Sequence, residues 1–364
     1  MLPGRQPLIV LQIISPQRYS GAERIAVYLA EGLQARGHKV VFASRNQPDF
    51  LAELKRRNLN CLSTRISGKL NPMTFCRALD VVRRVKPDII HTHLSTGGMW
   101  GSLAGRVLNI PVLAHVHALN SKWFFLPATR MAACSEGVKR HLIAQGVAPD
   151  QIAVIYNGIE APSFNNLRST EQVRQTLGLS PTAKAVGVTA HLSPKKGQRH
   201  LIEAMAILHA SQPDLHCFLI GEGRQRSELE EVTRQLGLTD RVHFLGYRPD
   251  AVELMQALDI VILPSVSKEG LGLALVEGGA LGKPVIGSDI PGIDEVIVQG
   301  VTGLLTPSAD AQALADAIST LLADPDLCHR MGEAGRQRAQ EMFTLERMID
   351  NTEALYYSML DERR

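Results

Sequence analysis

The sequence predicts an α/β fold with two doubly wound domains, each built around a mainly parallel sheet. Three observations lead to this expectation. With 364 residues the chain is too long for one ordinary domain and suits two of about 150–200 residues. Short apolar runs alternate with segments whose apolar residues recur at helical spacing. This alternation pauses near residue 180 and then starts again.

The first half begins with a continuous apolar run at residues 8–14, typical of a strand buried on both faces. A helix is expected next, ending before Gly37, because glycine commonly follows the last turn of a helix. Further strands of this half are expected at 39–43, 88–91, 112–115, 131–134 and 153–155. The second half repeats the pattern, with strands expected at 185–190, 216–220, 242–245, 260–263 and 284–286. The segment 169–184 is the expected boundary, so the predicted domains are residues 1–178 and 179–344.

The net charge of +3 conceals an asymmetry between the two halves. Residues 1–180 hold 22 basic against 10 acidic side chains, a net +12, whereas residues 181–364 hold 17 against 26, a net −9. This asymmetry indicates that one domain faces an anionic partner. The five cysteines are scattered without metal-type spacing, which fits a reducing compartment. Neither a signal peptide nor a membrane span is recognisable, so we expect a cytoplasmic location, with the inner face of the membrane as an alternative.

Two segments of the second half carry candidate chemistry. The first runs from His191 through Lys196 to Gly197, between an expected strand and an expected helix. Unpaired N–H groups at the start of a helix favour an anion, and a lysine adds a positive charge for a diphosphate. A solvated turn is the commoner explanation of such a segment when it stands alone.

The second segment, residues 268–277, places Glu269 in a loop and Glu277 about two turns into an expected helix. Gly270 and Gly272 between them permit a close approach of the backbone. A carboxylate accepts two hydrogen bonds in a fork, which suits a vicinal diol on ribose or a hexose. When two such glutamates stand without other motifs, Glu277 is more often a helix-surface residue and Glu269 a partner of the helix dipole.

The ordered set of motifs favours the functional interpretation of both segments over the structural one. The set is SGAE (20–23), RGHKV (36–40), DIIHTH (88–93), IYNGI (155–159), LSPKKG (192–197), IGEG (220–223), VHFLG (242–246), the pair Glu269 and Glu277, and GKPVI (282–286). In this order it resembles the retaining GT-B glycosyltransferases of the family 4 type (glycosyl transferases group 1), over most of the chain. The resemblance implies two Rossmann-like domains, the first binding an acceptor and the second a donor. It also implies that the C-terminal helix, residues 345–364, packs back on the first domain.

The activity implied by the resemblance is retaining transfer of a sugar, of the hexosyltransferase type, from a nucleotide-diphosphate sugar. A UDP-sugar is the favoured donor, and a cell-surface glycan or glycolipid, as in polysaccharide or lipopolysaccharide biosynthesis, is the expected acceptor. Carried over by motif, Lys196 contacts the donor diphosphate and Glu277 the ribose. Glu269, with the backbone of Gly270, Leu271 and Gly272, holds the hydroxyls of the transferred sugar.

Five further residues are implied in the same way. Gly21 lets the first loop approach the diphosphate, and the backbone near Tyr247 and Arg248 contacts the nucleobase. His117 matches a family histidine near the sugar, although the neighbouring His115 leaves that choice open. His191 stands where the family usually has an arginine on the phosphates, and histidine replaces that charge only when it is protonated, with an unperturbed pKa of about 6.5. Transfer is therefore expected to be slower or pH-sensitive.

No metal and no cofactor are expected. The leaving diphosphate can be stabilised by Lys196, protonated His191 and helix amides, so that no side-chain acid is required. The string Asp324-Pro-Asp326 fits a metal-binding Asp-x-Asp motif but lies far along the chain from the donor motifs. Asp-Pro is common in turns, which is the favoured interpretation.

The basic residues of the first half form either a solvated face or a surface that docks on an anionic membrane or a lipid-linked acceptor. Exposure of Trp123, Phe124 and Phe125 would favour the membrane, whereas burial would make them core residues. Nucleic acid is not expected as a partner, because no binding motif is present. Two alternatives remain: a nucleotide-sugar epimerase, and a donor-binding relative without transferase activity. A nicotinamide dehydrogenase is disfavoured, because Gly221-Glu-Gly223 lacks the third glycine of a dinucleotide fingerprint.

Overall fold

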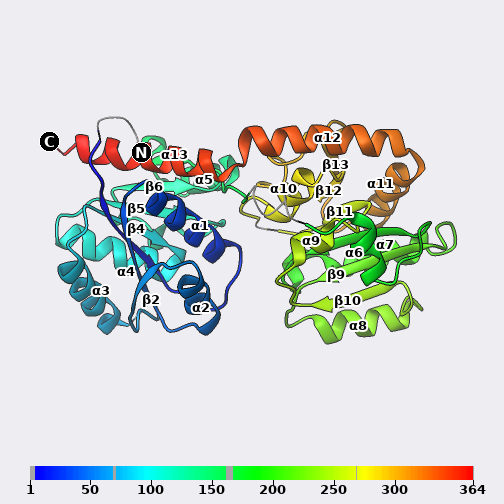
Figure 1. Cartoon of the computed structure of the whole chain (residues 1–364), viewed down its shortest axis with the longest axis horizontal. Helices are drawn as coiled ribbons and strands as arrows, with labels where there is room; N and C mark the ends of the chain where they lie inside the picture. The colour runs from blue at the N-terminus through cyan, green and yellow to red at the C-terminus, as the bar shows by residue number, and fades with distance from the viewer. Residues whose placement is uncertain (1–4, 69–70, 161–166, 268, 364) are drawn as a thin grey trace. The chain divides into compact units, whose positions relative to one another are not determined.

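The computed structural model describes residues 5–68, 71–160, 167–267 and 269–363, and it divides into two compact units (Figure 1). Unit 1 comprises Met1–Gly158 together with Thr344–Arg364, and unit 2 comprises Ile159–Phe343. Each is an α/β domain around one parallel sheet, which confirms the predicted fold class. Among the described helices, none is both long and apolar enough to cross a membrane.

Unit 1 contains a seven-stranded sheet in the order β3-β2-β1-β4-β5-β6-β7. Its strands are β1 (Ile9–Ile14), β2 (Lys39–Ser44), β3 (Asn60–Ser63), β4 (Ile89–His93), β5 (Val112–Val116), β6 (Arg130–Ala133) and β7 (Ile152–Val154). The central strands are buried on both faces, as expected for a sheet with helices on each side. The chain order reverses direction between β1 and β4, so this pair is the switch point of the sheet, where ligands of such folds bind.

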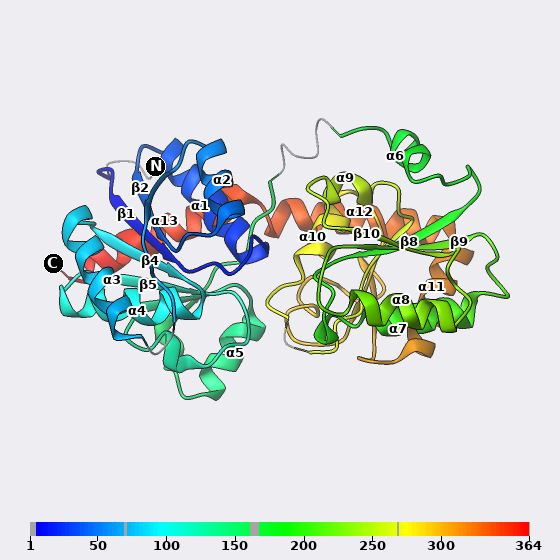
Figure 2. The ribbon, with the colours of Figure 1, turned by 90° about the horizontal axis from the view of Figure 1, so that it is seen from below.

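Six helices cover the two faces of this sheet. They are α1 (Gly21–Ala35), α2 (Pro48–Arg56), α3 (Pro72–Val85), α4 (Leu94–Val107), α5 (Glu136–Ala144) and α13 (Leu345–Asp361). Figure 2 shows α1, α2 and α13 on one face and α3, α4 and α5 on the other. The last helix therefore belongs to the domain in which the chain begins.

Buried charge holds α13 against unit 1. Glu353, fully buried on α13, accepts hydrogen bonds from Arg36 at 2.7 Å and from His38 Nε2 at 3.1 Å. The other ring nitrogen of His38 accepts a hydrogen bond from the backbone N–H of Leu8 at 3.1 Å, which assigns the proton to Nε2. A buried carboxylate needs such partners, and removing one of them is costly because the charge remains.

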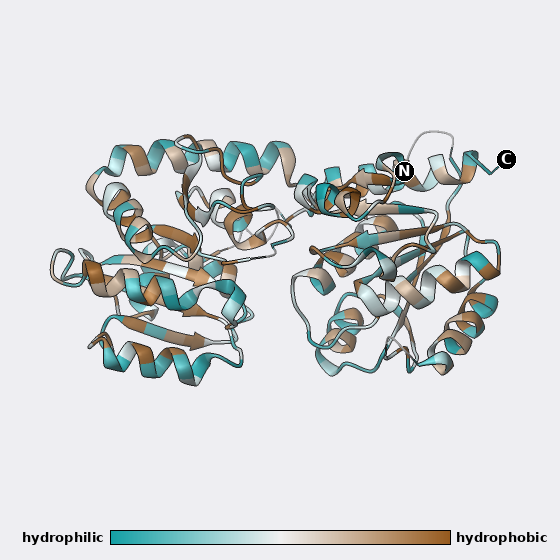
Figure 3. Cartoon of the chain, turned by 180° about the vertical axis from the view of Figure 1, so that it is seen from behind, coloured by the Kyte–Doolittle hydropathy of each residue, from teal (hydrophilic) through white to brown (hydrophobic). Residues whose placement is uncertain are grey.

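Unit 2 contains a six-stranded sheet in the order β10-β9-β8-β11-β12-β13. Its strands are β8 (Lys184–Thr189), β9 (Leu215–Ile220), β10 (Val242–Gly246), β11 (Ile260–Leu263), β12 (Val285–Ser288) and β13 (Gly303–Thr306). Its helices are α6 (Thr170–Thr176), α7 (Gln198–Leu208), α8 (Arg226–Gln235), α9 (Ala251–Met255), α10 (Leu273–Ala280), α11 (Ala311–Ala323) and α12 (Pro325–Met342). Here the switch point lies between β8 and β11. Figure 3 shows the strands of both units mainly in the hydrophobic colour, while most helices carry both colours.

The compact units divide about twenty residues before the boundary expected at 178/179. Residues 167–178 pack on unit 2: the Arg168 guanidinium pairs with Glu253 at 2.8 Å, and Arg174 donates to the carbonyl of Ala257 at 2.9 Å. The glycine and proline near residue 180 mark a turn within unit 2 rather than a linker between domains. The string Asp324-Pro-Asp326 starts α12, where Asp324 caps the helix by accepting from the N–H of Leu327 at 2.8 Å.

Candidate functional site

The loop that follows β8 lies against the loop that follows β11, at the switch point of unit 2. Gly197 has a φ of +69°, and a Cβ placed there would lie 1.9 Å from the carbonyl oxygen of Pro264. Only glycine permits this approach. The backbone N–H of Val266 donates to the carbonyl of Lys195 at 2.8 Å, and the Gln198 amide, almost fully buried, donates to the carbonyl of His191 at 3.1 Å. The two loops are therefore fixed to each other.

Lys196 and Glu269 are brought together by this contact. The Lys196 ammonium lies 2.6 Å from Glu269 Oε1, and the hydroxyl of Ser265 donates to the same oxygen at 2.6 Å. Glu269 is only 7% exposed and Ser265 is fully buried. Charge-assisted hydrogen bonds of this length fix both side chains in position. The two residues come from loops 73 positions apart in the sequence and form one charged unit.

The segment after Glu269 leads into α10 at the same edge of the sheet. Gly272 has a φ of +74° and is the residue before the first helical position of α10, while Leu271 is 2% exposed. Glu277, 5% exposed, lies on the second turn of that helix. Because it is almost fully buried, its carboxylate faces the interior of the unit rather than solvent.

Tyr247 and Arg248 follow β10, two strands away from β8 on the same edge of the sheet. The Arg248 guanidinium forms a two-pronged pair with Asp250, at 2.7 and 2.6 Å. The pairing lowers the pKa of the Asp250 carboxyl, mainly through the hydrogen bond from Arg248. The ring of Tyr247 is 63% exposed. The two positions therefore lie on the same side of the sheet as Lys196 but are not in contact with it.

This edge of unit 2 can hold an anion beside a polyol. A helix N-terminus, a lysine and a run of backbone amides favour an anion, and two carboxylates can accept hydrogen bonds from hydroxyl groups. Because Lys196 is bound to Glu269, an incoming anion would have to share the ammonium group with that carboxylate. The positive and hydroxyl-binding parts of the site are thus coupled through one hydrogen bond.

Gly21 lies at the first position of α1, after the loop that follows β1 in unit 1. The preceding Ser20 and the later Glu23 form a capping box: the Ser20 hydroxyl lies 2.7 Å and its backbone N–H 3.2 Å from Glu23 Oε2. Burial raises the pKa of the Glu23 carboxyl. The capping box fixes the entry of the chain into α1 and holds Gly21 at the switch point.

Four histidines line the α1/α13 face of the sheet in unit 1: His91 and His93 on β4, and His115 on β5 with His117 just after it. His93 is paired with His115 in the sheet register. His93 Nδ1 lies 3.0 Å from His117 Nε2, and His93 Nε2 lies 3.1 Å from Gln12 Oε1 of β1. His91 Nδ1 lies 2.6 Å from the hydroxyl of Tyr356 on α13.

Burial keeps these four rings neutral. It lowers the pKa of His115 to about 3, and it holds the pKa values of His91, His93 and His117 well below the usual value for histidine. The neighbouring rings act in the same direction, because a second positive charge would repel the first. The cluster therefore offers lone pairs and N–H groups but no positive charge near neutral pH.

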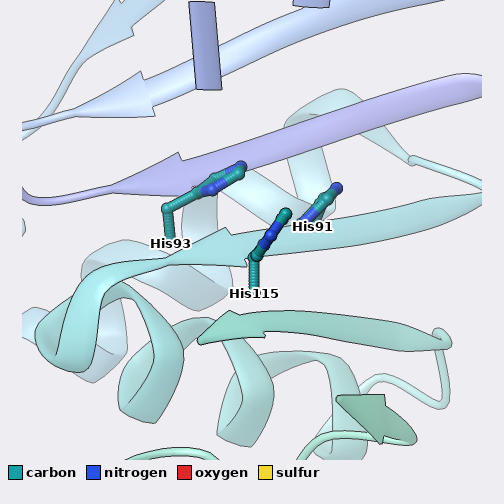
Figure 4. A group of neighbouring side chains, drawn as sticks. All are labelled: His91, His93 and His115. Carbon is teal, nitrogen blue, oxygen red and sulfur yellow. The ribbon is translucent and has the colours of Figure 1, made fainter. Parts of the chain in front are cut away.

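Figure 4 shows His91, His93 and His115, whose ring nitrogens lie within 4.8 Å of one another. Three histidines on one face are also a familiar ligand set for zinc. Their rings are nearly parallel, at 18° for His91 and His93 and 9° for His91 and His115, and both nitrogens of His93 already have partners. Ligands of one ion point their lone pairs at a common centre, so the geometry described is that of a hydrogen-bonded stack.

Three functional candidates had not been predicted: Ser265, Gln12 and His93. Ser265 lies between two predicted motifs, in the strand-to-loop turn that carries Glu269. Gln12 and His93 interrupt apolar strands, and both are completely buried. A polar side chain inside a continuous apolar strand is the sequence signal that would have found them, because buried polar groups require partners.

Comparison with known families matches both halves of the chain. Residues 169–338 match the family described as Glycosyl transferases group 1, and residues 19–161 match Glycosyltransferase Family 4. The N-acetyl-alpha-D-glucosaminyl L-malate synthase of Bacillus anthracis is 32% identical, with 93% of this chain and 94% of that protein covered. The D-inositol 3-phosphate glycosyltransferase of Corynebacterium glutamicum is 31% identical, with 71% of this chain and 69% of that protein covered.

Solved structures share the fold of this chain. Anabaena HepE, determined in complex with UDP-glucose, has a TM-score of 0.87 and 25% identity, with 96% of this chain and all of that chain covered. A glycosyltransferase from Rickettsia africae has a TM-score of 0.88 at 23% identity, with 98% and 99% covered. The second match bears on the fold alone, which is of the GT-B type.

Proposed function

The chain belongs to the group 1, family 4 glycosyltransferases, and on that premise we propose that it transfers a sugar from a UDP-sugar to a cell-surface glycan or glycolipid, with retention of configuration. The donor is inferred from Anabaena HepE, which was determined with UDP-glucose. The two relatives described above are an N-acetyl-alpha-D-glucosaminyl L-malate synthase and a D-inositol 3-phosphate glycosyltransferase, which points to different acceptors. Because those acceptors differ, the acceptor class is inferred from the basic character of the first half of the chain.

The observation that carries the proposal is the Lys196–Glu269 contact of 2.6 Å at the switch point of unit 2. A nucleoside diphosphate leaves easily once its developing negative charge is stabilised. Lys196, the amides at the start of α7 and those of residues 270–272 all follow strands that end at one edge of the sheet, and we infer that they supply that stabilisation. Glu269 then accepts hydrogen bonds from the sugar hydroxyls, and Glu277 from the ribose.

In the proposed mechanism the charge of the leaving group is met by Lys196 and by protonated His191. The acceptor hydroxyl attacks on the face that the diphosphate leaves, and a phosphate oxygen accepts its proton. No side-chain acid and no metal ion is required for this path, so transfer is expected to proceed in the presence of a chelator. In unit 1, the family motifs assign Gly21 a role toward the diphosphate and His117 a role toward the sugar.

Peripheral membrane contact is the second part of the proposal. Trp123 is 70% exposed, with the Lys122 ammonium 5.3 Å from its ring centroid, whereas Phe125 is fully buried. One of the three aromatics therefore meets the condition for membrane contact, and one is a core residue. Two basic side chains of the first half are already paired, since Arg56 and Arg57 both bind Glu53. We expect weak, salt-sensitive binding to vesicles with anionic lipids, measured by flotation.

A donor and acceptor panel tests the transfer. Nucleotide sugars are first ranked by thermal stabilisation of the protein, and the best ones are then assayed for nucleotide diphosphate release with and without a lipid extract. We expect a UDP-sugar to stabilise the protein and UDP release to depend on the extract. The anomeric configuration of the product, read by its NMR coupling constants, should match that of the donor.

The same panel separates the alternatives. Isomerisation of the donor without an acceptor would show an epimerase, and donor binding without turnover on any extract would show a binding protein. An inverted product anomer would refute retention while leaving transfer intact.

A further inference from the structure

Gln12 on β1, His93 on β4 and His117, just after β5, form a continuous hydrogen-bonded chain in unit 1. Gln12 Oε1 lies 3.1 Å from His93 Nε2, and His93 Nδ1 lies 3.0 Å from His117 Nε2. Gln12 and His93 have no exposed surface. At the end of the chain, His117 Nδ1 is buried and has no hydrogen-bond partner among the residues that the structure describes.

The chemistry of the first member determines the proton on every later one. The carbonyl oxygen of Gln12 only accepts, so His93 must carry its proton on Nε2. A neutral imidazole has one N–H, which leaves His93 Nδ1 as a lone pair that accepts from His117. His117 therefore carries its proton on Nε2, and its Nδ1 is a bare lone pair.

We propose that Gln12 and His93 are positioning residues that hold His117 in the Nε2–H tautomer, so that its Nδ1 accepts a hydrogen bond from a hydroxyl group of the substrate. The second clause rests on the proposed function, whereas the tautomer does not. A bare lone pair attracts a hydroxyl proton and repels a phosphate or carboxylate oxygen. This place in unit 1 therefore favours a hydroxyl group over an anion.

The orientation of the Gln12 amide decides between two opposite outcomes. If its nitrogen faced His93, every donor and acceptor in the chain would reverse, and His117 Nδ1 would carry a proton and donate. The order of donors and acceptors is fixed only if each ring is neutral and carries one N–H. Burial keeps the rings neutral, because it holds the pKa values of His93 and His117 well below the usual value. In proteins, the hydrogen bond made by one ring nitrogen of a histidine usually determines which of the two nitrogens carries the proton.

The tautomer is measured directly on the full chain labelled with ¹⁵N-histidine. Long-range ¹H–¹⁵N correlation at pH 7.5 distinguishes a ring nitrogen that carries a proton from a bare one, and the signals of His117 are assigned by their loss in His117→Asn. We expect His117 to be protonated on Nε2 alone. A proton on Nδ1, or on both nitrogens, would overturn the proposal.

Gln12→Met removes the acceptor at nearly constant volume, and Tyr356→Phe is the matched control. The control removes the hydroxyl that contacts His91 in the same cluster but leaves the relay intact. In Gln12→Met we expect the Nδ1–H form of His117 to appear and kcat/KM to fall about tenfold, the effect of one hydrogen bond. Tyr356→Phe should leave the tautomer of His117 unchanged. An unchanged tautomer in a folded Gln12→Met protein would refute the positioning role.

The spectrum of the parent protein decides the tautomer even where Gln12→Met fails to fold. Turnover is scored separately: if the donor panel yields no transfer, the proposed function fails while the tautomer result still stands. If transfer occurs and every donor lacking one hydroxyl loses as much affinity in His117→Asn as the complete donor does, the hydroxyl contact fails.

Discussion

The switch points of the two sheets share a topology and differ in the chemistry that they offer. In unit 2 the loops after β8 and β11, together with α10, present a lysine, two glutamates and glycine backbone, with the ammonium and a carboxylate in direct contact. In unit 1 the strands β1, β4 and β5 present neutral, buried imidazoles and an amide. The comparison teaches that position in the fold locates a site but not its chemistry: unit 2 is equipped for charge, and unit 1 for neutral hydrogen bonding.

The largest expected effect is the loss of charge in unit 2. Lys196→Met should lower kcat/KM by about 10²–10³, because one fixed donor to a developing anion contributes about that factor. The adjacent Lys195→Met removes the same charge from an exposed side chain and is the matched control. Steady-state kinetics with the best donor of the panel measures both. Equal losses in the two variants would show a diffuse charge effect and contradict the assignment to Lys196.

The second effect belongs to unit 1 and concerns stability toward acid. The pKa values of the four clustered histidines are lowered by burial, that of His115 to about 3, so the unfolded chain binds protons below about pH 6.5 that the folded one rejects. Stability is therefore complete above that pH and decreases as pH falls. At pH 5 each histidine that stays neutral should cost about 2 kcal/mol of unfolding free energy.

Tryptophan fluorescence isolates this effect, because both tryptophans of the chain, Trp100 and Trp123, lie in unit 1. Urea unfolding between pH 5 and 7.5 should show the decrease. His115→Leu is the sharpest comparison, since neither ring nitrogen of His115 has a partner among the described residues. We expect a shallower pH dependence with little loss at pH 7.5. A slope identical to that of the parent would mean that His115 is charged in the folded state.

The third effect separates the two glutamates of unit 2. Glu277→Gln should weaken UDP binding about tenfold with little change in kcat, because one charge-assisted hydrogen bond to the ribose is lost. Glu269→Gln should leave UDP binding nearly intact and lower kcat, since its carboxylate holds Lys196 and the sugar. Calorimetry with UDP and kinetics with the UDP-sugar give the two values. Glu231→Gln, on the exposed face of α8, serves as the control, and reversal of the two patterns would exchange the roles assigned here.

The smallest effect is a gain. His191→Arg should tighten UDP binding a few-fold, and more at pH 8 than at pH 6, because arginine stays charged while histidine loses its proton. Titration at the two pH values measures the difference. An equal gain at both would show that His191 is already protonated beside the diphosphate.

Much of the fold followed from local pattern, and the misses lie at the sheet edges. The buried central strands were predicted within one or two residues because their apolar runs are continuous. The edge strands β3 and β13 were not predicted: β3 is mostly exposed and polar, so it lacks that signal, and Gly303 opens β13. The predicted boundary was displaced because a turn inside unit 2 has the same composition as a linker.

The candidate site divides in the same way. Lys196, Glu269 and Glu277 could be placed on one edge because each follows or flanks a recognisable strand. The Lys196–Glu269 bond and the Gln12–His93–His117 chain could not, because they depend on how strands distant in the sequence are paired. Gln12 lies opposite His91 and His93 lies opposite His115 only once the parallel registers are known.

The contribution of α13 to unit 1 has a consequence for how the protein is made. Unit 2 is inserted between the first 158 residues and the closing segment that begins at Thr344, so unit 1 is assembled from the two ends of the chain. During synthesis this face of the sheet stays uncovered until α13 leaves the ribosome. Until then Glu353 is not available to Arg36 and His38, nor Tyr356 to His91. Unit 2 can fold first. A chain terminated early would then carry a folded unit 2 and an uncovered sheet in unit 1, which is a target for chaperones and proteases.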